Sequence, residues 1–172
     1  MSAMLDFDAT SLGNHEFDDG VSGLEPFLRN QTCPVVVSNM NFKEIKLNPD
    51  SSLYSNSSEL NGLYNSSYIL HRRGRKIGLV GYLTPDTIFT SSVPANLVLE
   101  DEVEALTREV EKLTAAGVDI IIALGHSGYL MDKKIAEEVP NIDIIVGAHS
   151  HSFLFTQQGN RTNPSNNVIE GA

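Results

Sequence analysis

Apolar residues recur along this chain with two different periods, which predicts strands and helices in turn. Residues 119–124 and 143–146 each begin with an aspartate and continue as a short run rich in isoleucine and valine, so each predicts a buried strand. Residues 99–116 repeat apolar positions at intervals of three and four, begin with a cluster of acids and end before Gly117. That pattern predicts an amphipathic helix between strands, and hence an α/β domain.

The remaining segments extend this pattern. Helices are predicted at residues 20–29 and 131–139, and strands at 34–38, 66–71, 76–83 and 153–156. Residues 72–75 carry three arginines and are a predicted exposed turn between two of these strands. We expect the end of a helix and then a short strand or turn in residues 1–9, a long surface excursion in 40–67, a loop in 84–94 and an aperiodic polar segment in 157–172.

Composition and charge exclude several functional classes. The chain has 172 residues, enough to bury a core, and a formal net charge of −10. An acidic protein is poorly suited to non-specific binding of nucleic acid or of an anionic membrane. No apolar run approaches the roughly 20 residues that span a bilayer, and residues 1–5 show no signal peptide.

Two features bear on the cellular compartment. Four glycosylation acceptor triplets favour an extracellular location; they begin at Asn30, Asn56, Asn65 and Asn160. The single cysteine, Cys33, has two interpretations that the sequence leaves open. It is either a buried small apolar residue or half of a disulfide whose partner lies outside this chain.

Three glycine-containing loops carry the residues suited to chemistry. The first, residues 13–18, reads GNHEFD. The second and third, residues 125–127 and 147–151, read GHS and GAHSH, and each follows a predicted strand. Polar side chains just beyond buried strands lie at the carboxyl edge of an α/β sheet, where the sites of such folds are found. The pattern therefore predicts a metal-dependent hydrolytic site.

Imidazole and amide groups in these loops are suitable metal ligands. His149 and His151 point the same way if their segment is extended, and address neighbouring ions if it forms a tight loop. Neutral imidazole binds zinc and similar ions, and an amide oxygen such as that of Asn14 suits a harder site shared with carboxylates. His126, at the adjacent strand end, would complete the protein ligands of one ion.

The first loop also offers a group that does not bind metal. His15 is placed to stabilise or protonate a phosphate oxygen, with Asp18 holding its ring. Each residue has a plainer alternative: a lone histidine is often only hydrogen-bonded, Asn14 suits a turn, Asp18 suits a helix N-cap and Glu16 suits a helix N-terminus. Four of the five histidines stand in these loops, whereas His71 is expected to be structural or exposed.

Longer motifs resemble those of the 5′-nucleotidase family within the calcineurin-like metallophosphoesterases. Residues 12–20 (LGNHEFDDG), 124–128 (LGHSG) and 149–156 (HSHSFLFT) carry the resemblance, which covers nearly the whole chain. The chain looks most similar to animal ecto-5′-nucleotidases and to secreted apyrase-like members of insects and ticks. The resemblance implies a metallophosphoesterase sandwich, with sheets flanked by helices. It also implies two divalent ions, zinc first and manganese or calcium as alternatives, that polarise phosphate and activate water.

The same resemblance implies roles for six residues. The ligands of one ion would be an amide and two imidazoles: Asn14, His126 and His149. His151 occupies the position that supplies a ligand to the other ion, which some relatives fill with an amide side chain. His15 and Asp18 match the catalytic dyad of the family.

The chain departs from the family pattern at both ends. The Asp-x-His and Gly-Asp motifs that precede the first loop in the family do not occur, and Asp6 and Asp8 have no histidine at the required spacing. We therefore expect residues 1–156 to be a partial metallophosphoesterase domain, without its N-terminal strands and with an exposed sheet edge. Residues 157–172 would lead to a C-terminal nucleotide-binding domain outside this chain. An internal fragment of this kind is expected to have little or no activity alone.

The function implied for the full-length protein is hydrolysis of extracellular nucleotides. A 5′-nucleotidase would convert AMP to adenosine and phosphate, whereas an apyrase would act on ATP and ADP, and the motifs are common to both. Any membrane anchor would belong to the C-terminal region outside this chain. A secreted binding module without turnover is a further alternative, but the intact pair of His15 and Asp18 favours an enzyme. A purely structural α/β domain would leave the four loop histidines unexplained.

Overall fold

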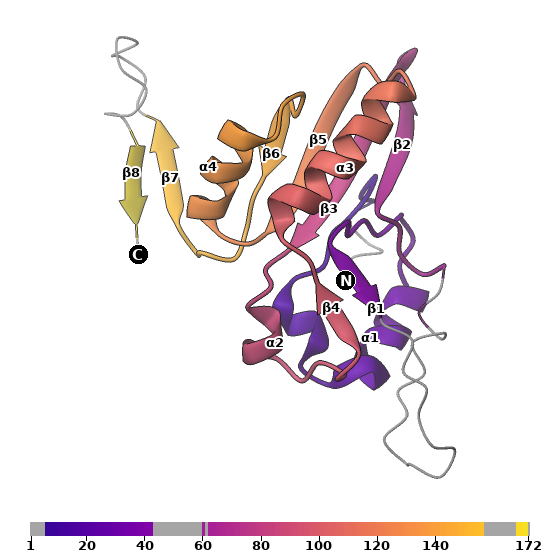
Figure 1. Cartoon of the computed structure of the whole chain (residues 1–172), viewed down its shortest axis with the longest axis vertical. Helices are drawn as coiled ribbons and strands as arrows, with labels where there is room; N and C mark the ends of the chain where they lie inside the picture. The colour runs from indigo at the N-terminus through magenta and orange to yellow at the C-terminus, as the bar shows by residue number, and fades with distance from the viewer. Residues whose placement is uncertain (1–5, 43–59, 61, 157–167, 172) are drawn as a thin grey trace.

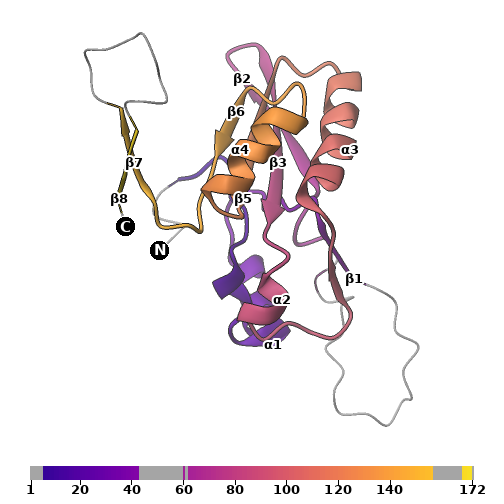
Figure 2. The same cartoon turned by 60° about the vertical axis from the view of Figure 1, so that its left-hand side comes forward.

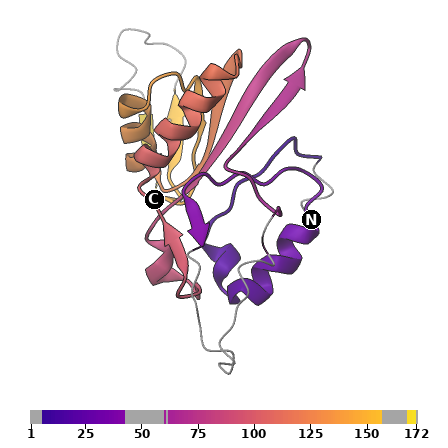
Figure 3. The same cartoon turned by 45° about the vertical axis from the view of Figure 1, so that its right-hand side comes forward.

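A four-stranded sheet organises the fold in the computed structural model, which describes residues 6–42, 60, 62–156 and 168–171. Its strands lie in the order β2 (Ser67–Arg72), β3 (Arg75–Leu83), β5 (Ile120–His126) and β6 (Ile144–Val146). β2 and β3 form an antiparallel hairpin, which extends away from the part of the molecule that holds helix α1 (Gly20–Arg29) (Figure 3). β3, β5 and β6 are parallel, so their carboxyl ends meet at one edge.

Two helices cover one face of this sheet. After β3 the chain passes through the short strand β4 (Leu97–Leu99) into α3 (Glu102–Ala115), which leads to β5, and α4 (Tyr129–Glu138) connects β5 to β6 (Figures 1 and 2). Apolar residues of both helices pack on alternate strand positions in one cluster: Val80, Tyr82, Leu106, Val110, Leu113, Ile121, Ala123, Ile135 and Val139. Gly78 lets α3 approach closely, because a Cβ there would lie 3.0 Å from Cδ1 of Leu113.

A second core lies beyond the carboxyl edge of the sheet. It surrounds η2 (Asn14–Phe17) and α1 (Gly20–Arg29), with α2 (Thr87–Thr90) beside them (Figure 1). Its buried members come from several segments: Leu12, Phe17, Val21, Leu24, Leu28, Val35, Val37, Met40, Leu60, Leu83 and Leu97. This core holds the loop of residues 13–18 against the end of the sheet.

Two small antiparallel ladders complete the described structure. β1 (Met40–Phe42) pairs with β4 (Leu97–Leu99), and β7 (Phe153–Thr156) pairs with β8 (Val168–Gly171). The β7–β8 ladder stands beyond α4, to one side of the main sheet (Figures 1 and 2). The structure confirms the predicted α/β class, with sheets flanked by helices.

Several predicted elements are confirmed closely. The helix predicted at residues 20–29 is α1, and the turn at 72–75 joins β2 to β3. The helix predicted at 131–139 begins two residues earlier, at Tyr129. The helix predicted from residue 99 begins only at Glu102, because Leu97–Leu99 pair with β1 and the Asp101 side chain caps the helix by accepting from the Glu104 amide at 3.1 Å.

Other predictions are wrong in detail. Residues 34–38 are buried but form isolated bridges to Thr10 and Asn65, because successive amides bond to different neighbours and no ladder develops. The expected excursion from residue 40 begins with strand β1, and residues 43–59 and 61 of it lie outside the described residues. The expected loop at 84–94 contains α2. Residues 6–9 form a turn and a bend, in agreement with the short strand or turn expected there, and residues 1–5 before them lie outside the described residues.

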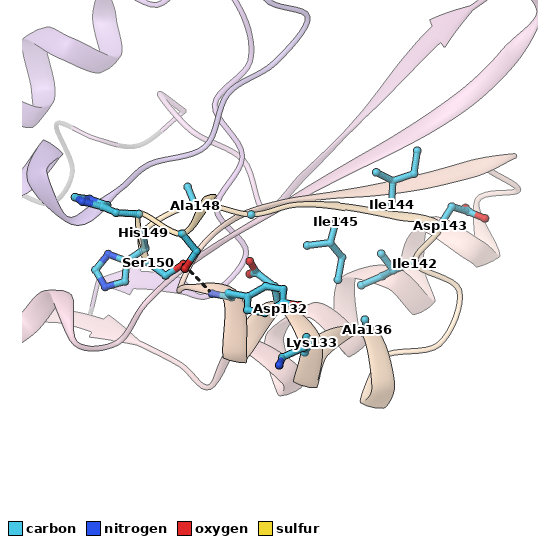
Figure 4. A pocket seen from close by; sticks show the side chains of 14 residues that line it. Asp132, Lys133, Ala136, Ile142, Asp143, Ile144, Ile145, Ala148, His149 and Ser150 are labelled. Atoms are coloured by element: carbon cyan, nitrogen blue, oxygen red, sulfur yellow. Dashed lines mark hydrogen bonds between the residues drawn. The ribbon is translucent and has the colours of Figure 1, made fainter. Parts of the chain in front are cut away.

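The β6 strand forms with less burial than its sequence predicts. Ile144 is 50% exposed and Val146 is 55% exposed, on the face opposite α4. Ile145 points toward α4 and Ile144 away from it (Figure 4). β6 is the last strand of its sheet among the described residues, so its outer edge has no strand partner there.

Candidate metal centre and catalytic loop

The candidate site lies where the parallel strands end and η2 approaches them. His126, predicted within the loop of residues 125–127, is instead the last residue of β5, and its carbonyl accepts from the Thr84 amide at 3.1 Å. The segment after β6 brings His149 beside it. Asn14 is the first residue of η2. The structure therefore brings together three of the predicted ligands from three separate elements.

Local contacts fix the η2 loop against β5. The Gly13 amide donates to Oε2 of Glu16 at 2.6 Å, which closes the turn. A Cβ at Gly13 would lie 2.8 Å from Cε1 of His126, so glycine is needed for the loop to approach the ring this closely. Phe17 is fully buried and anchors the far end of the turn. Glu16 thus stabilises the turn, as its plainer interpretation predicted.

Asn14 is oriented from two directions. Its side chain is nearly buried, and the Ser91 hydroxyl donates to its backbone carbonyl at 2.7 Å. Its Oδ1 lies 3.1 Å from Nε2 of His126. Two ligand atoms on one ion at zinc-type bond lengths are about 3 Å apart, so this pair is spaced as ligands of a shared ion would be.

His126 and His149 form the imidazole part of the cluster. Their ring centroids are 5.1 Å apart with the planes tilted by 56°. Burial, followed by the neighbouring His149, lowers the pKa of His126 below its ordinary value. The ring is therefore neutral at neutral pH, which is the form that binds a metal.

The donor set fits a divalent ion only in part. One amide oxygen and two neutral imidazoles suit zinc or a harder ion. Among the described residues, however, no three histidine, cysteine, aspartate or glutamate side chains are gathered closely enough to form a metal site by themselves. Asn14 is thus essential to the proposed ligand set.

The segment that carries His149 and His151 is a tight turn. Both residues adopt positive φ, 88° and 54°, which removes the extended alternative for this segment. The turn is fastened to α4, where the Gly128 amide donates to the Ala148 carbonyl at 3.0 Å. The Tyr129 amide also donates to the Ser150 hydroxyl at 3.3 Å (Figure 4). Left-handed backbone at non-glycine residues costs about 1–2 kcal/mol each and often marks a functional segment.

The predicted catalytic pair is present and exposed. Nδ1 of His15 lies 2.9 Å from Oδ2 of Asp18, and the two side chains are 75% and 52% exposed. Asp18 is not a helix N-cap, because that position before α1 belongs to Asp19. His71 is exposed on β2, as one of its two predicted alternatives has it.

A pocket of about 600 Å³ opens beside this site. It lies between α4 and the chain of residues 142–152, and it includes His149 and His151 (Figure 4). Neither Asn14, His126 nor the His15–Asp18 pair lines it. The pocket therefore follows the open β6 edge and meets the candidate ligands only at one end.

Sequence reasoning missed three side chains that support the site. Ser91 holds the Asn14 backbone, and Tyr82 and Asp132 form a hydrogen-bonded pair behind the ligand loops. A tyrosine at the end of an apolar strand and an acid in the first turn of a helix are common features. Neither signal is specific enough to identify them without the fold.

Cys33 has a free thiol and is partly buried, rather than fully buried as the simpler alternative predicted. Burial raises the pKa of this thiol.

Comparison with known proteins matches this arrangement. The Calcineurin-like phosphoesterase family model matches residues 6–153. The chain belongs to this family. It is 44% identical to the 5′-nucleotidase of Mus musculus over 89% of the chain, and 39% identical to a snake venom 5′-nucleotidase of Naja atra over 97%. It covers 25% and 29% of those two relatives, so the chain spans about a quarter of their length.

Solved structures give the same result. The 5′-nucleotidase precursor of Thermus thermophilus superposes with a TM-score of 0.80 at 31% identity, over 95% of this chain and 30% of that one. The NAD nucleotidase of Haemophilus influenzae superposes with a TM-score of 0.76 at 29% identity, over 91% of this chain and 26% of that one. The family resemblance predicted from the three loop motifs is confirmed.

Proposed function

We propose that this chain supplies part of the catalytic domain of an extracellular 5′-nucleotidase, which converts a nucleoside 5′-monophosphate to nucleoside and phosphate. The observation that carries the proposal is the junction of two groups on η2. Asn14 meets His126 at 3.1 Å, and the next residue, His15, forms the exposed pair with Asp18. A ligand set and an acid–base group thus lie side by side. The relatives named 5′-nucleotidase support the substrate class.

The proposed metal ligands follow from the cluster. Asn14, His126 and His149 would hold one divalent ion, and His151 would contribute to a second. When bound, such ions polarise the phosphate and lower the pKa of a coordinated water. Zinc is the proposed metal, with manganese and calcium as alternatives, because the amide and imidazole donors suit borderline and harder ions.

His15 is the proposed acid–base group. Its Nδ1 faces Asp18, so the ring is held with Nε2 free. In the protonated ring, Nε2–H donates to a phosphate oxygen and stabilises the negative charge that develops there. Its exposure leaves room for substrate to reach it. Asp18 fixes the orientation of the ring.

The proposed location is extracellular. Relatives include a snake venom protein, and four glycosylation triplets are present in the sequence. No helix in the described part of the chain is long and apolar enough to cross a bilayer.

Phosphate release provides the test. AMP, ADP and ATP are offered with zinc, manganese or calcium to this chain, and to a chimera in which the flanking regions of the mouse relative are joined to it. Hydrolysis of AMP by the chimera, lost in His15→Ala and retained in the exposed control His71→Ala, supports the proposal. Release from ADP and ATP instead of AMP replaces it with an apyrase. Metal binding without release from any nucleotide overturns the enzyme and favours a binding module.

A further inference from the structure

A buried tyrosine hydroxyl and a half-buried carboxylate form a pair directly behind the two histidine-bearing strand ends. Tyr82 of β3 is fully buried, and its hydroxyl donates to Oδ1 of Asp132 on α4 at 2.5 Å. This is the short distance expected when an O–H donates to a carboxylate. Asp132 reaches from α4 toward the chain at the end of β6 (Figure 4).

Each member of the pair occupies the space that a side chain would fill at a glycine, which is Gly125 of β5 for Tyr82 and Gly147, just after β6, for Asp132. A Cβ at Gly125 would lie 1.9 Å from Cζ of Tyr82, so the ring lies flat against the β5 backbone. A Cβ at Gly147 would lie 1.8 Å from Oδ2 of Asp132, and its three nearest atoms all belong to that carboxylate. Glycine is required at both positions by the Tyr82–Asp132 pair itself.

The two glycines stand next to the candidate ligands. Gly125 precedes His126 directly, and Gly147 precedes His149 by two residues. Tyr82 is the registered partner of Gly125, and side chains alternate between the faces of a strand. The pair therefore contacts the helix-side face, while His126 extends from the opposite face toward Asn14.

The pair lies where the regular sheet stops. The last registered residues of β5 and β6 are Leu124 and Val146, so ladder pairing between these strands ends just before the two glycines. Beyond this point the His149 turn is joined to α4 through the Gly128 and Tyr129 amides. Since no ladder hydrogen bonds join β5 to β6 beyond this point, other contacts must fix the positions of the two strand ends relative to each other.

The geometry points to Tyr82 and Asp132 as positioning residues for His126 and His149. The pair braces the backbones of Gly125 and Gly147, which means that it packs against them on the helix side, and so holds the two imidazole rings at a fixed distance from each other. This inference rests on the proposed metal centre for its functional meaning. The bracing itself is a property of the metal-free chain. Burial raises the pKa of Asp132, and the hydrogen bond from the Tyr82 hydroxyl opposes that rise.

The test measures ring geometry and metal affinity separately. In the metal-free chain, NMR should show a nuclear Overhauser contact between the rings of His126 and His149, whose centroids are 5.1 Å apart. Asp132→Ala should abolish it. Asp132→Asn keeps an oxygen that can accept from Tyr82 and should preserve it. Co²⁺ titration, followed by visible absorption, should show affinity reduced by about tenfold or more in Asp132→Ala and in Tyr82→Phe.

A matched control separates positioning from general stability. Tyr64→Phe removes a half-buried tyrosine hydroxyl from the second core, where it lies 3.5 Å from the Met40 carbonyl. It should leave both the ring contact and the Co²⁺ affinity unchanged. The double variant Gly147→Ala with Asp132→Ala should bind Co²⁺ as well as Asp132→Ala alone, because the clash has been removed.

Two outcomes overturn the inference. One is an unchanged ring contact in a folded Asp132→Ala variant. The other is equal loss of Co²⁺ affinity in Tyr64→Phe and Tyr82→Phe, which would mean that only stability is involved. If the unchanged chain binds no Co²⁺, the metal centre is wrong, and the ring contact alone still decides the bracing.

Discussion

The candidate ligands and the proposed catalytic pair are adjacent in space but are held in different ways. Asn14, His126 and His149 come from three elements, and Asn14 and His126 are separated by 112 positions in sequence. His15 and Asp18 lie three residues apart in one turn and are largely exposed. The first group depends on how η2, β5 and the β6 turn pack together, whereas the second needs little beyond its own turn.

This difference predicts different responses to change. Loss of packing behind the strand ends should weaken metal binding and leave the His15–Asp18 contact intact. Loss of the exposed pair should affect turnover and leave folding and metal binding intact. Substitutions in each group, and a change of pH, test whether metal binding and turnover respond independently.

The largest effect is expected from His15→Ala. In the chimera that hydrolyses AMP, kcat should fall by about 10²- to 10⁴-fold, because a positioned acid–base group contributes that much. Co²⁺ affinity and melting temperature should match the parent, since the ring is exposed. A parallel fall in Co²⁺ affinity would place His15 among the ligands and end the distinction.

His126→Ala should weaken Co²⁺ binding by about a hundredfold. Metal binding of about 10–16 kcal/mol, spread over the four positions of a tetrahedral site of which the proposed ligands fill three, gives about 3 kcal/mol for each position. Calorimetric titration measures the change, and His71→Ala serves as the exposed control. Undiminished affinity in His126→Ala would remove the strand-end cluster as the metal centre.

Stability of the metal-free chain should depend on pH through His126. Its pKa is lowered in the folded state, so the unfolded chain binds the proton more readily. The stability linked to neutral His126 is fully present above its unfolded-state pKa of 6.5, and it is lost as pH falls toward the lower folded-state pKa. Chemical denaturation should show this slope, at most about 1.4 kcal/mol per pH unit, and His126→Gln should flatten it. A slope that persists in His126→Gln would assign it to other groups.

Asp18→Asn should change stability least. The His15–Asp18 pair is exposed, so its loss should alter the free energy of unfolding by less than about 0.5 kcal/mol. Tyr82→Phe, by contrast, removes a half-buried hydrogen bond between distant elements and should cost about 1–3 kcal/mol. Urea denaturation measures both changes in the free energy of unfolding. Equal losses in Asp18→Asn and Tyr82→Phe would contradict the view that the first contact is local and the second depends on tertiary packing.

The sequence predicts the local elements of this fold well. The period of α1 and the arginine-rich turn between β2 and β3 depend on residues close together in the chain. Strand ends that carry histidines also predict the location of the site, because parallel strands place their carboxyl ends at one edge. The His15–Asp18 contact follows from a spacing of three residues.

Properties that depend on distant partners are harder to predict. α3 begins at Glu102 and not at the predicted residue 99, because Leu97–Leu99 pair with strand β1, which lies more than 50 residues earlier in the chain. Residues 144 and 146 look like core residues, yet their exposure depends on what adjoins β6. The Tyr82–Asp132 pair spans 50 positions, and no local pattern indicates that these two side chains meet.

The most direct test of the division between ligands and catalytic pair is histidine NMR during zinc titration. If Asn14, His126 and His149 hold the first ion, the ring nitrogen signals of His126 and His149 shift with the first equivalent, while those of His15 and His71 do not. His15 would then remain the free acid–base group. A first-equivalent shift at His15, or none at His126, would contradict that division.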